Sequence, residues 1–228
     1  MSFSQLFFTR SADGASFSIT SAGKILCVVL LLLVLSVVSV ISGKKSKKRS
    51  PKRLVYSSAA LALGYLLSFL QPYKLPWGGS VTLFSMLFVC LIGYWYGLSA
   101  GLCAGFAFSL LQFLQDGGGF ILSPLQLCCD YFFAFTALGL SGVCTKMKNG
   151  LAKGYLLAVF VRGLFHSVGA YFFWMDYMPD SFPKNLAMLY PIIYNYSYLL
   201  IEAVATLVLI RIPAVKKALA KIREDALS

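Results

Sequence analysis

Residues 80–115 read SVTLFSMLFVCLIGYWYGLSAGLCAGFAFSLLQFLQ, a run of 36 residues without a charged side chain. An α-helix rises about 1.5 Å per residue and a bilayer core is about 30 Å thick, so this run is too long for one span. We predict two membrane helices joined by a tight turn near Tyr96–Ser99. Glycine recurs at every fourth position here, which favours close packing of helix backbones. These glycines are Gly93, Gly97, Gly101 and Gly105.

The composition of the whole chain indicates the same class of protein. Its 228 residues are 59% hydrophobic and have a mean hydropathy of +0.78, more apolar surface than a soluble domain of this length needs. The net charge of +12 lies in clusters between apolar runs. We therefore expect the basic side chains to meet a lipid bilayer and no nucleic acid. The six cysteines lie in or beside apolar segments without a C-x-x-C pair, as buried side chains do.

Three basic clusters predict the orientation, because Lys- and Arg-rich loops stay on the cytoplasmic side of a membrane. They are Lys44, Lys45, Lys47, Lys48, Arg49, Lys52 and Arg53; Lys146, Lys148 and Lys153; and Arg211, Lys216, Lys217, Lys221 and Arg223. The first cluster follows an apolar segment at residues 25–42, which we interpret as a retained anchor. Residues 1–23 are polar and rich in serine, and we expect them to be poorly ordered or interfacial.

The predicted fold is an all-α integral membrane protein with a six-helix core and one extra N-terminal transmembrane helix. The core spans are the apolar runs at residues 54–71, 80–115 (two spans), 121–143, 154–174 and 187–210. The chain then divides into a tail, anchor and basic linker (1–53), a core (54–212) and a basic cytoplasmic tail (213–228). Both ends of the core are cytoplasmic, in a multi-pass protein of the plasma membrane.

Five polar or ionisable side chains lie inside predicted spans, where such groups are costly and mark functional sites by default. They are Asp130, Arg162, His166, Asn195 and Glu202. Counted from the outer helix ends, Asp130, His166 and Asn195 lie at one depth, about 12–14 Å below the outer surface. We expect these three side chains to share a pocket. The alternative is that the polar groups only pair with one another and hold helices together.

Two of the five lie deeper. We predict an ion pair between Arg162 and Glu202 that forms the floor of the pocket and has a structural role. Pairing of Arg162 with Asp130 is the competing possibility.

Aromatic side chains are predicted above this level. They are Trp77, Phe120, Tyr131, Trp174, Tyr190 and Tyr194. Singly, each is typical of the belt at a membrane interface. Together with an acid, a histidine and an asparagine, they suggest a cage for a flat, cationic molecule that enters from outside.

Sequence motifs of catalysis are absent. The chain has no G-x-x-x-x-G-K-[ST] sequence to hold ATP and, with one histidine, no H-E-x-x-H metal motif. We expect no enzymatic activity, no cofactor and no metal, and any ATP hydrolysis must come from another subunit.

At this point the sequence resembles a known family, the thiamine-specific S components (ThiT family) of energy-coupling factor (ECF) transporters, over residues 54–212. The motifs that carry the resemblance are LPWGGS at 75–80, ILSPLQ at 121–126, DY at 130–131 and ALGL at 137–140, with His166 before Trp174 and Tyr190 before Asn195. The resemblance implies a six-helix substrate-binding subunit that captures thiamine. It also implies partners: a transmembrane coupling subunit and two ATPase subunits.

The family's pocket residues match positions of this chain one by one. The resemblance assigns substrate binding to Trp77, Tyr131, Arg162, His166, Trp174, Tyr190 and Asn195. The family's pocket glutamate is Asp130 here, one methylene shorter, and a family tyrosine is Phe120. The family docks through an A-x-x-x-A face on its first core helix, and the nearest small pairs here are Ser58/Ala62 and Ala60/Gly64.

Other functions are compatible with the same residues. The two departures favour another flat vitamin or a pyrimidine precursor as the ligand. A proton-coupled secondary transporter would use Asp130 or Glu202 as its proton carrier. A small intramembrane enzyme is the least favoured, because no nucleophile is paired with a base.

Overall fold

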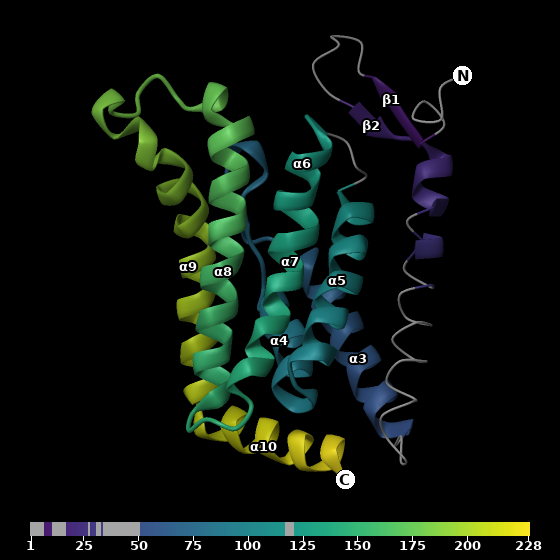
Figure 1. Cartoon of the computed structure of the whole chain (residues 1–228). Coiled ribbons are helices and arrows are strands. Elements are labelled where there is room, and N and C mark those ends of the chain that lie inside the picture. Colours follow the sequence, from purple (N-terminus) through teal and green to yellow (C-terminus); the bar gives the residue numbers. More distant parts are fainter. Residues whose placement is uncertain (1–6, 11–16, 27, 31–32, 34–50, 117–120) are drawn as a thin grey trace.

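The computed structural model describes residues 7–10, 17–26, 28–30, 33, 51–116 and 121–228. Their helices form an upright bundle, with one further helix lying across its lower end (Figure 1). Most of the predicted anchor at 25–42 and of the basic linker after it lies outside the described residues, while the last linker residues, 51–53, begin a helix. The division into three parts at residues 53 and 212 stays a prediction.

The bundle is built from α3 (Pro51–Ser68), α4 (Ser85–Tyr96), α5 (Leu98–Gln115), a composite helix at 124–144, α8 (Gly150–Phe173) and α9 (Tyr190–Arg211). Among the described residues, four helical stretches are long and apolar enough to cross a membrane: Leu98–Gln115, Pro124–Cys144, Gly150–Phe173 and Lys184–Arg211. An all-α membrane protein is therefore the fold, whereas the count of six core spans stays a prediction.

The predicted turn inside residues 80–115 is present between α4 and α5. Gly97 has φ +87°, a left-handed conformation that side chains rarely adopt, so glycine suits this turn. Gly101 packs against the composite helix so closely that a Cβ there would lie 2.5 Å from the carbonyl oxygen of Gly139. The glycines therefore act in turning and packing.

The start of α4 corrects the sequence analysis, which began a helical span at residue 80. The chain first forms β3 (Tyr73–Lys74), a 3₁₀ turn at Pro76–Gly78 and β4 (Ser80–Val81), and α4 starts at Ser85. Strand β3 pairs with β4 in antiparallel register, Tyr73 opposite Val81. Non-helical backbone is tolerated at membrane depth where it is buried in protein or lines a cavity, and this segment lines one.

The composite helix is not a regular α-helix. It consists of α6 (Pro124–Leu127), a π-helical segment Cys128–Phe133, α7 (Ala134–Thr136) and a 3₁₀ segment Ala137–Cys144. Single π-turns inside helices are frequent at functional sites. The π-helical segment carries Asp130 and Tyr131.

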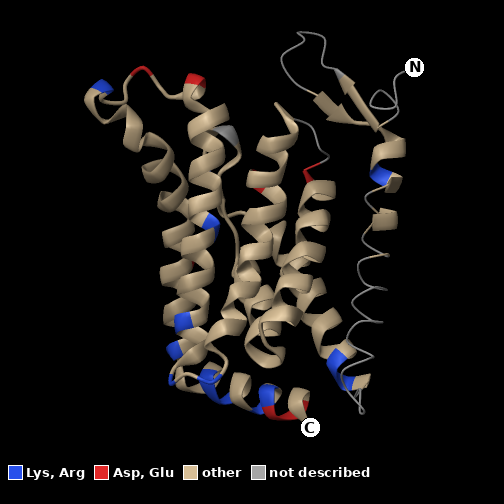
Figure 2. Cartoon of the chain, in the orientation of Figure 1, with Lys and Arg blue, Asp and Glu red and all other residues tan. Residues whose placement is uncertain are grey.

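The C-terminal tail, predicted only as basic, is a helix, α10 (Pro213–Leu227). It lies across the end of the bundle where most Lys and Arg residues gather (Figure 2). The Tyr96 hydroxyl donates to the Ala226 carbonyl at 3.2 Å, and the Arg223 guanidinium lies 4.4 Å from the Tyr94 ring centre. The gathering of positive charge fits a cytoplasmic placement of this end, which stays a prediction.

Two short strands near the N-terminus give part of residues 1–23 a regular structure, whereas the expected interfacial position stays a prediction. Strands β1 (Phe8–Arg10) and β2 (Phe17–Ile19) pair antiparallel, with Phe8 opposite Ile19. They lie at the end of the bundle opposite to α10 (Figure 1).

Candidate ligand-binding site

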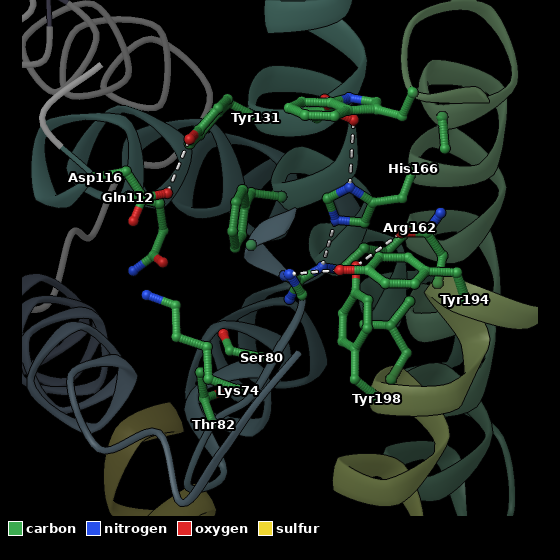
Figure 3. A pocket seen from close by; sticks show the side chains of 18 of the residues that line it. Lys74, Ser80, Thr82, Gln112, Asp116, Tyr131, Arg162, His166, Tyr194 and Tyr198 are labelled. Carbon is green, nitrogen blue, oxygen red and sulfur yellow. Dashed lines mark hydrogen bonds and ion pairs between the residues drawn. The ribbon is translucent and has the colours of Figure 1, made fainter. Parts of the chain in front are cut away.

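A cavity of about 550 Å³ lies between the 71–85 segment, α5, the composite helix, α8 and α9. Its size is within the range of small-molecule sites, roughly 300–1,000 Å³. The walls combine charged, amide and hydroxyl side chains with aromatic rings (Figure 3). Of the predicted binding residues, Asp130, Tyr131, Arg162, His166, Trp174, Tyr190 and Asn195 line this cavity.

The other two predicted aromatics cannot be placed on the cavity. Phe120 lies outside the described residues, as does the side chain of Trp77. The backbone of Trp77 belongs to the 3₁₀ turn at Pro76–Gly78, and Gly78 lines the cavity.

Asp130 is the acid that contacts three side chains of the cavity wall, Gln126, Trp174 and His166. Its Oδ2 accepts hydrogen bonds from Gln126 Nε2 at 2.7 Å and Trp174 Nε1 at 3.0 Å. Its Oδ1 lies 3.7 Å from His166 Nδ1. A carboxylate has about four lone-pair sites, so part of its accepting capacity is left for a further donor.

His166 connects Asp130 to the deeper part of the cavity. Its Nε2 accepts a hydrogen bond from Arg162 Nε at 3.3 Å, so this nitrogen bears a lone pair and the ring proton is on Nδ1, toward Asp130. The neutral imidazole thus lies between the Asp130 carboxylate and the Arg162 guanidinium.

The predicted ion pair between Arg162 and Glu202 does not form among the described residues. Arg162 instead lies over the Phe135 ring, 4.2 Å from its centre, and donates to His166. The competing pair of Arg162 with Asp130 is not direct either, because His166 stands between them.

Glu202 has another role, at the start of α4. Its Oε2 accepts from Thr82 Oγ1 at 2.6 Å and from Thr82 N at 3.1 Å, and its Oε1 accepts from Met86 N at 3.3 Å. A negative group near a helix N-terminus satisfies free N–H groups and favours the helix dipole. Glu202 therefore holds the non-helical segment and α4 against α9.

Asn195 is buried, and both ends of its amide form hydrogen bonds within its own helix. Its Nδ2 donates to the Pro191 carbonyl at 2.8 Å, and its Oδ1 accepts from the Tyr198 hydroxyl at 3.0 Å. It lines the same cavity as Asp130 and His166, but no hydrogen bond joins it to either of them in the described structure.

Tyrosines one turn apart form the α9 wall of the cavity. Ring centres of Tyr190 and Tyr194 are 5.8 Å apart, and those of Tyr194 and Tyr198 are 6.1 Å apart. The Tyr194 hydroxyl donates to the Pro76 carbonyl and accepts from the Gly79 N–H at 3.1 Å. Tyr194 thereby holds the 76–79 turn at the cavity.

A polar wall opposite α9 was missed by the sequence analysis. Its side chains are Gln71, Lys74, Gln112, Asp116 and Gln126. The position of Gln126, one helical turn before Asp130, was the available signal for that residue. The other four side chains belong to loops or helix ends, where the periodicity of the sequence does not predict how far below the membrane surface a side chain lies.

Asp116, just after α5, is the acid at this polar wall. It accepts a hydrogen bond from the Tyr131 hydroxyl at 2.9 Å. Desolvation raises the pKa of the Asp116 carboxyl above its usual value, and the Tyr131 hydroxyl and the charge of Lys74 oppose this only in part. Its charge is therefore less favourable here than in water.

A cavity with aromatic walls, three acids and neighbouring cations, inside an apolar helical bundle, defines the class: a membrane protein with a site for a small molecule. Within the described residues no group of three or more His, Cys, Asp or Glu could hold a metal ion.

The chain belongs to the family described as Thiamine transporter protein (Thia_YuaJ), which matches residues 54–222. It is 31% identical over 139 residues to the thiamine transporter ThiT of Bacillus subtilis, covering 55% of this chain and 70% of that protein. It is 29% identical over 129 residues to ThiT of Lacticaseibacillus paracasei, covering 50% and 63%. The resemblance drawn from the sequence is confirmed.

A solved structure of ThiT from Listeria monocytogenes has the same fold. The TM-score is 0.57 at 22% sequence identity, and the match covers 75% of this chain and 96% of the other. The matched family region begins after the N-terminal strands, at residue 54.

Proposed function

We propose that this protein is the substrate-binding subunit of an ECF-type transporter and captures thiamine in the cavity for import. The observation that carries the proposal is the Asp130 carboxylate beside aromatic walls in a cavity of about 550 Å³. Thiamine carries a permanent positive charge on a flat ring. Aromatic faces and a partly desolvated carboxylate both favour such a cation.

In this proposal each wall has its own part in binding. Trp174 and Tyr190 offer ring faces to the flat ligand, and His166 offers the edge of a neutral imidazole. Asp130 provides the negative charge, while its bonds from Gln126 and Trp174 fix its orientation before the ligand arrives. Such preorganisation lowers the ordering cost of binding.

The proposed partners are a transmembrane coupling subunit and two ATPase subunits, since this chain has no P-loop sequence.

The two candidate docking pairs on α3 differ in their exposure. Ala60 and Gly64 are buried, and a Cβ on Gly64 would lie 3.2 Å from Phe88 Cβ. Ser58 and Ala62 are exposed, with Val55 and Leu66 on the same face. We propose Ser58 and Ala62 as the docking pair, because small residues let helices approach closely.

Thiamine titration of the purified protein, followed by tryptophan fluorescence, tests the proposed ligand. We expect submicromolar affinity and a loss of at least about 1–2 kcal/mol in Asp130→Asn, because the cation loses its counter-charge. The matched control is Asp176→Asn, an exposed acid in an outer connection that does not line the cavity. Millimolar or absent binding by the unmodified protein would refute thiamine as the ligand.

A second candidate is another flat vitamin or a pyrimidine precursor. The engagement of Asp130 Oδ2 by both Gln126 and Trp174 favours it, since less of this carboxylate is free to face a cation. A thermal-shift panel of vitamins distinguishes the two, because the true ligand raises the melting temperature by mass action.

Dependence on partner subunits separates the ECF proposal from proton-coupled transport. Uptake in cells should require the ATPase subunits and should persist when the proton gradient is dissipated. Uptake without those subunits that collapses with the gradient would favour a secondary transporter instead.

A further inference from the structure

The N-terminal hairpin, defined here as residues 7–10 and 17–24, is attached to the outer end of the bundle. Thr9 Oγ1 and Ser18 Oγ lie 2.8 Å apart on the two strands. The N–H of Thr20 donates to the Phe7 carbonyl at 2.9 Å and closes the base of the hairpin. Gly23 fits against this base, where a Cβ would lie 2.5 Å from the Phe7 carbonyl oxygen.

Two kinds of contact fasten the hairpin to the chain before α6. Phe17 and Ile121 form an antiparallel bridge in which Phe17 N donates to the Ile121 carbonyl at 2.8 Å and Ile121 N donates back at 3.0 Å. Ile19, 8% exposed, is buried in an apolar cluster with Phe113, Ile121 and Leu127. The hairpin thus contributes both hydrogen bonds and a buried side chain.

Ile121 lies at the start of a chain of hydrogen bonds that ends at the cavity. The next residue, Leu122, donates its N–H to Gln126 Oε1 at 3.2 Å. The amide nitrogen of the same Gln126 side chain donates to Asp130 Oδ2 at 2.7 Å. The position of the 121–122 backbone therefore sets the amide that orients Asp130.

A second route passes through the apolar cluster to Tyr131. Phe113 packs edge-on against the Tyr131 ring, with centres 5.4 Å apart. The hydroxyl of Tyr131 donates to Asp116, and both side chains line the cavity. Leu127 of the cluster lies directly before the π-helical segment that carries Asp130 and Tyr131.

We propose that Phe17 and Ile19 of the N-terminal hairpin are positioning residues for the cavity, which hold the 121–131 segment in its ligand-retaining arrangement. The inference rests on the proposed function for its ligand, thiamine. It goes beyond that function because the family match begins at residue 54, after the hairpin. Loss of the bridge or of the Ile19 contacts should therefore loosen the 121–131 segment and speed ligand release.

The experiment compares the full-length chain with four variants. Phe17→Pro removes the N–H that bonds the Ile121 carbonyl, and its control Phe17→Leu keeps it. Ile19→Ala removes most of the buried side chain, and its control Ile19→Val keeps the branched part. Two quantities are measured on each: the dissociation rate of labelled thiamine, and amide hydrogen exchange of the 121–133 segment without ligand.

We expect Phe17→Pro and Ile19→Ala to release thiamine roughly tenfold faster, the equivalent of losing one or two hydrogen bonds or a buried contact. Exchange in the 121–133 segment should rise in the same two variants, while Phe17→Leu and Ile19→Val stay near the unmodified protein. A lower melting temperature with unchanged dissociation and unchanged exchange in 121–133 would mean a merely structural hairpin and overturn the inference.

The two proposals fail in different ways. If the unmodified protein does not bind thiamine, the proposed ligand is wrong, and exchange of the ligand-free 121–133 segment then decides the positioning role alone. The other outcome is that the unmodified protein binds thiamine while all four variants release thiamine at its rate and show its hydrogen exchange in 121–133. In that case the positioning role is wrong and the proposed ligand stands.

Discussion

Replacing Glu202 by Gln tests whether this buried carboxylate holds the start of α4. The carboxylate faces three donors: the hydroxyl and the N–H of Thr82, and the N–H of Met86. The Gln side chain has one oxygen in place of two. If that oxygen stays with Thr82, its NH₂ group is turned toward the Met86 N–H, and two donors then face each other.

The expected cost follows from those contacts. A hydrogen bond to a charged group contributes about 1.5–3 kcal/mol, and an anion near a helix N-terminus adds about 0.3–1 kcal/mol. The variant should therefore lose roughly 2–4 kcal/mol of stability. For a chain of this size each kcal/mol shifts the melting temperature by about 2–4 °C, which gives a fall of roughly 4–16 °C.

The assay is thermal unfolding of the ligand-free protein in detergent, followed by circular dichroism. Glu224→Gln is the matched control, because Glu224 is an exposed acid on α10. Thr82→Val adds a double-mutant cycle, in which the loss of the hydroxyl should cost less when Glu202 is already Gln. Equal melting of Glu202→Gln and the unmodified protein would refute the role of Glu202 as the anchor of α4.

Three further predictions concern the cavity. Trp174→Phe keeps an aromatic ring but loses the hydrogen bond to Asp130. Thiamine titration should show binding weakened by about 1–3 kcal/mol, while the melting temperature of the ligand-free protein should change little. Unchanged affinity would contradict this prediction. Gly79→Ala places a Cβ 2.9 Å from the Tyr194 hydroxyl, and both ligand affinity and melting temperature should fall. Because desolvation beside the cavity raises the folded-state pKa of Asp116, folding disfavours its charged form, by a small amount since the residue is exposed. The Asp116→Asn variant should therefore have a higher melting temperature than the unmodified protein at neutral pH. This difference in melting temperature should shrink as the pH falls from the raised pKa of Asp116 toward the usual pKa of an aspartate. A difference that does not depend on pH would contradict the prediction.

Hydrophobic runs and charge clusters predicted the helices well, because burial in lipid depends on composition over whole segments. The break near Gly97 followed from the length of the apolar run. The placement of Asp130, His166 and Asn195 on one cavity followed from counting residues from the outer helix ends, although Asp130 lies in a π-helical segment. Depth can be counted in this way as long as the rise per residue is constant.

Hydrophobic pattern does not predict where polar side chains replace regular backbone hydrogen bonds, and two expectations were wrong for this reason. Residues 80–84 are apolar enough to belong to a span, yet α4 begins only at Ser85. Glu202, 120 positions from Thr82, accepts the Thr82 N–H and so satisfies the non-helical backbone before the helix. The partner of Arg162 was also wrong, because an ion pair was inferred from depth alone, while His166 on the same helix face was nearer. Such pairings depend on the three-dimensional positions of side chains, which the periodicity of a sequence does not predict.

The cavity therefore depends on two sets of hydrogen bonds with different consequences. Glu202 and Tyr194 satisfy backbone groups of the 76–86 segment that lie outside regular helix. The Gln126 and Trp174 side chains donate to the Asp130 carboxylate, and losing these contacts between side chains leaves the backbone hydrogen bonds of the 76–86 segment in place. Substitutions in the first set should lower stability first and affinity as a consequence, whereas those in the second should lower affinity alone. If Asp130→Asn instead destabilised the ligand-free protein as strongly as Glu202→Gln, this separation between the scaffold and the binding groups would be wrong.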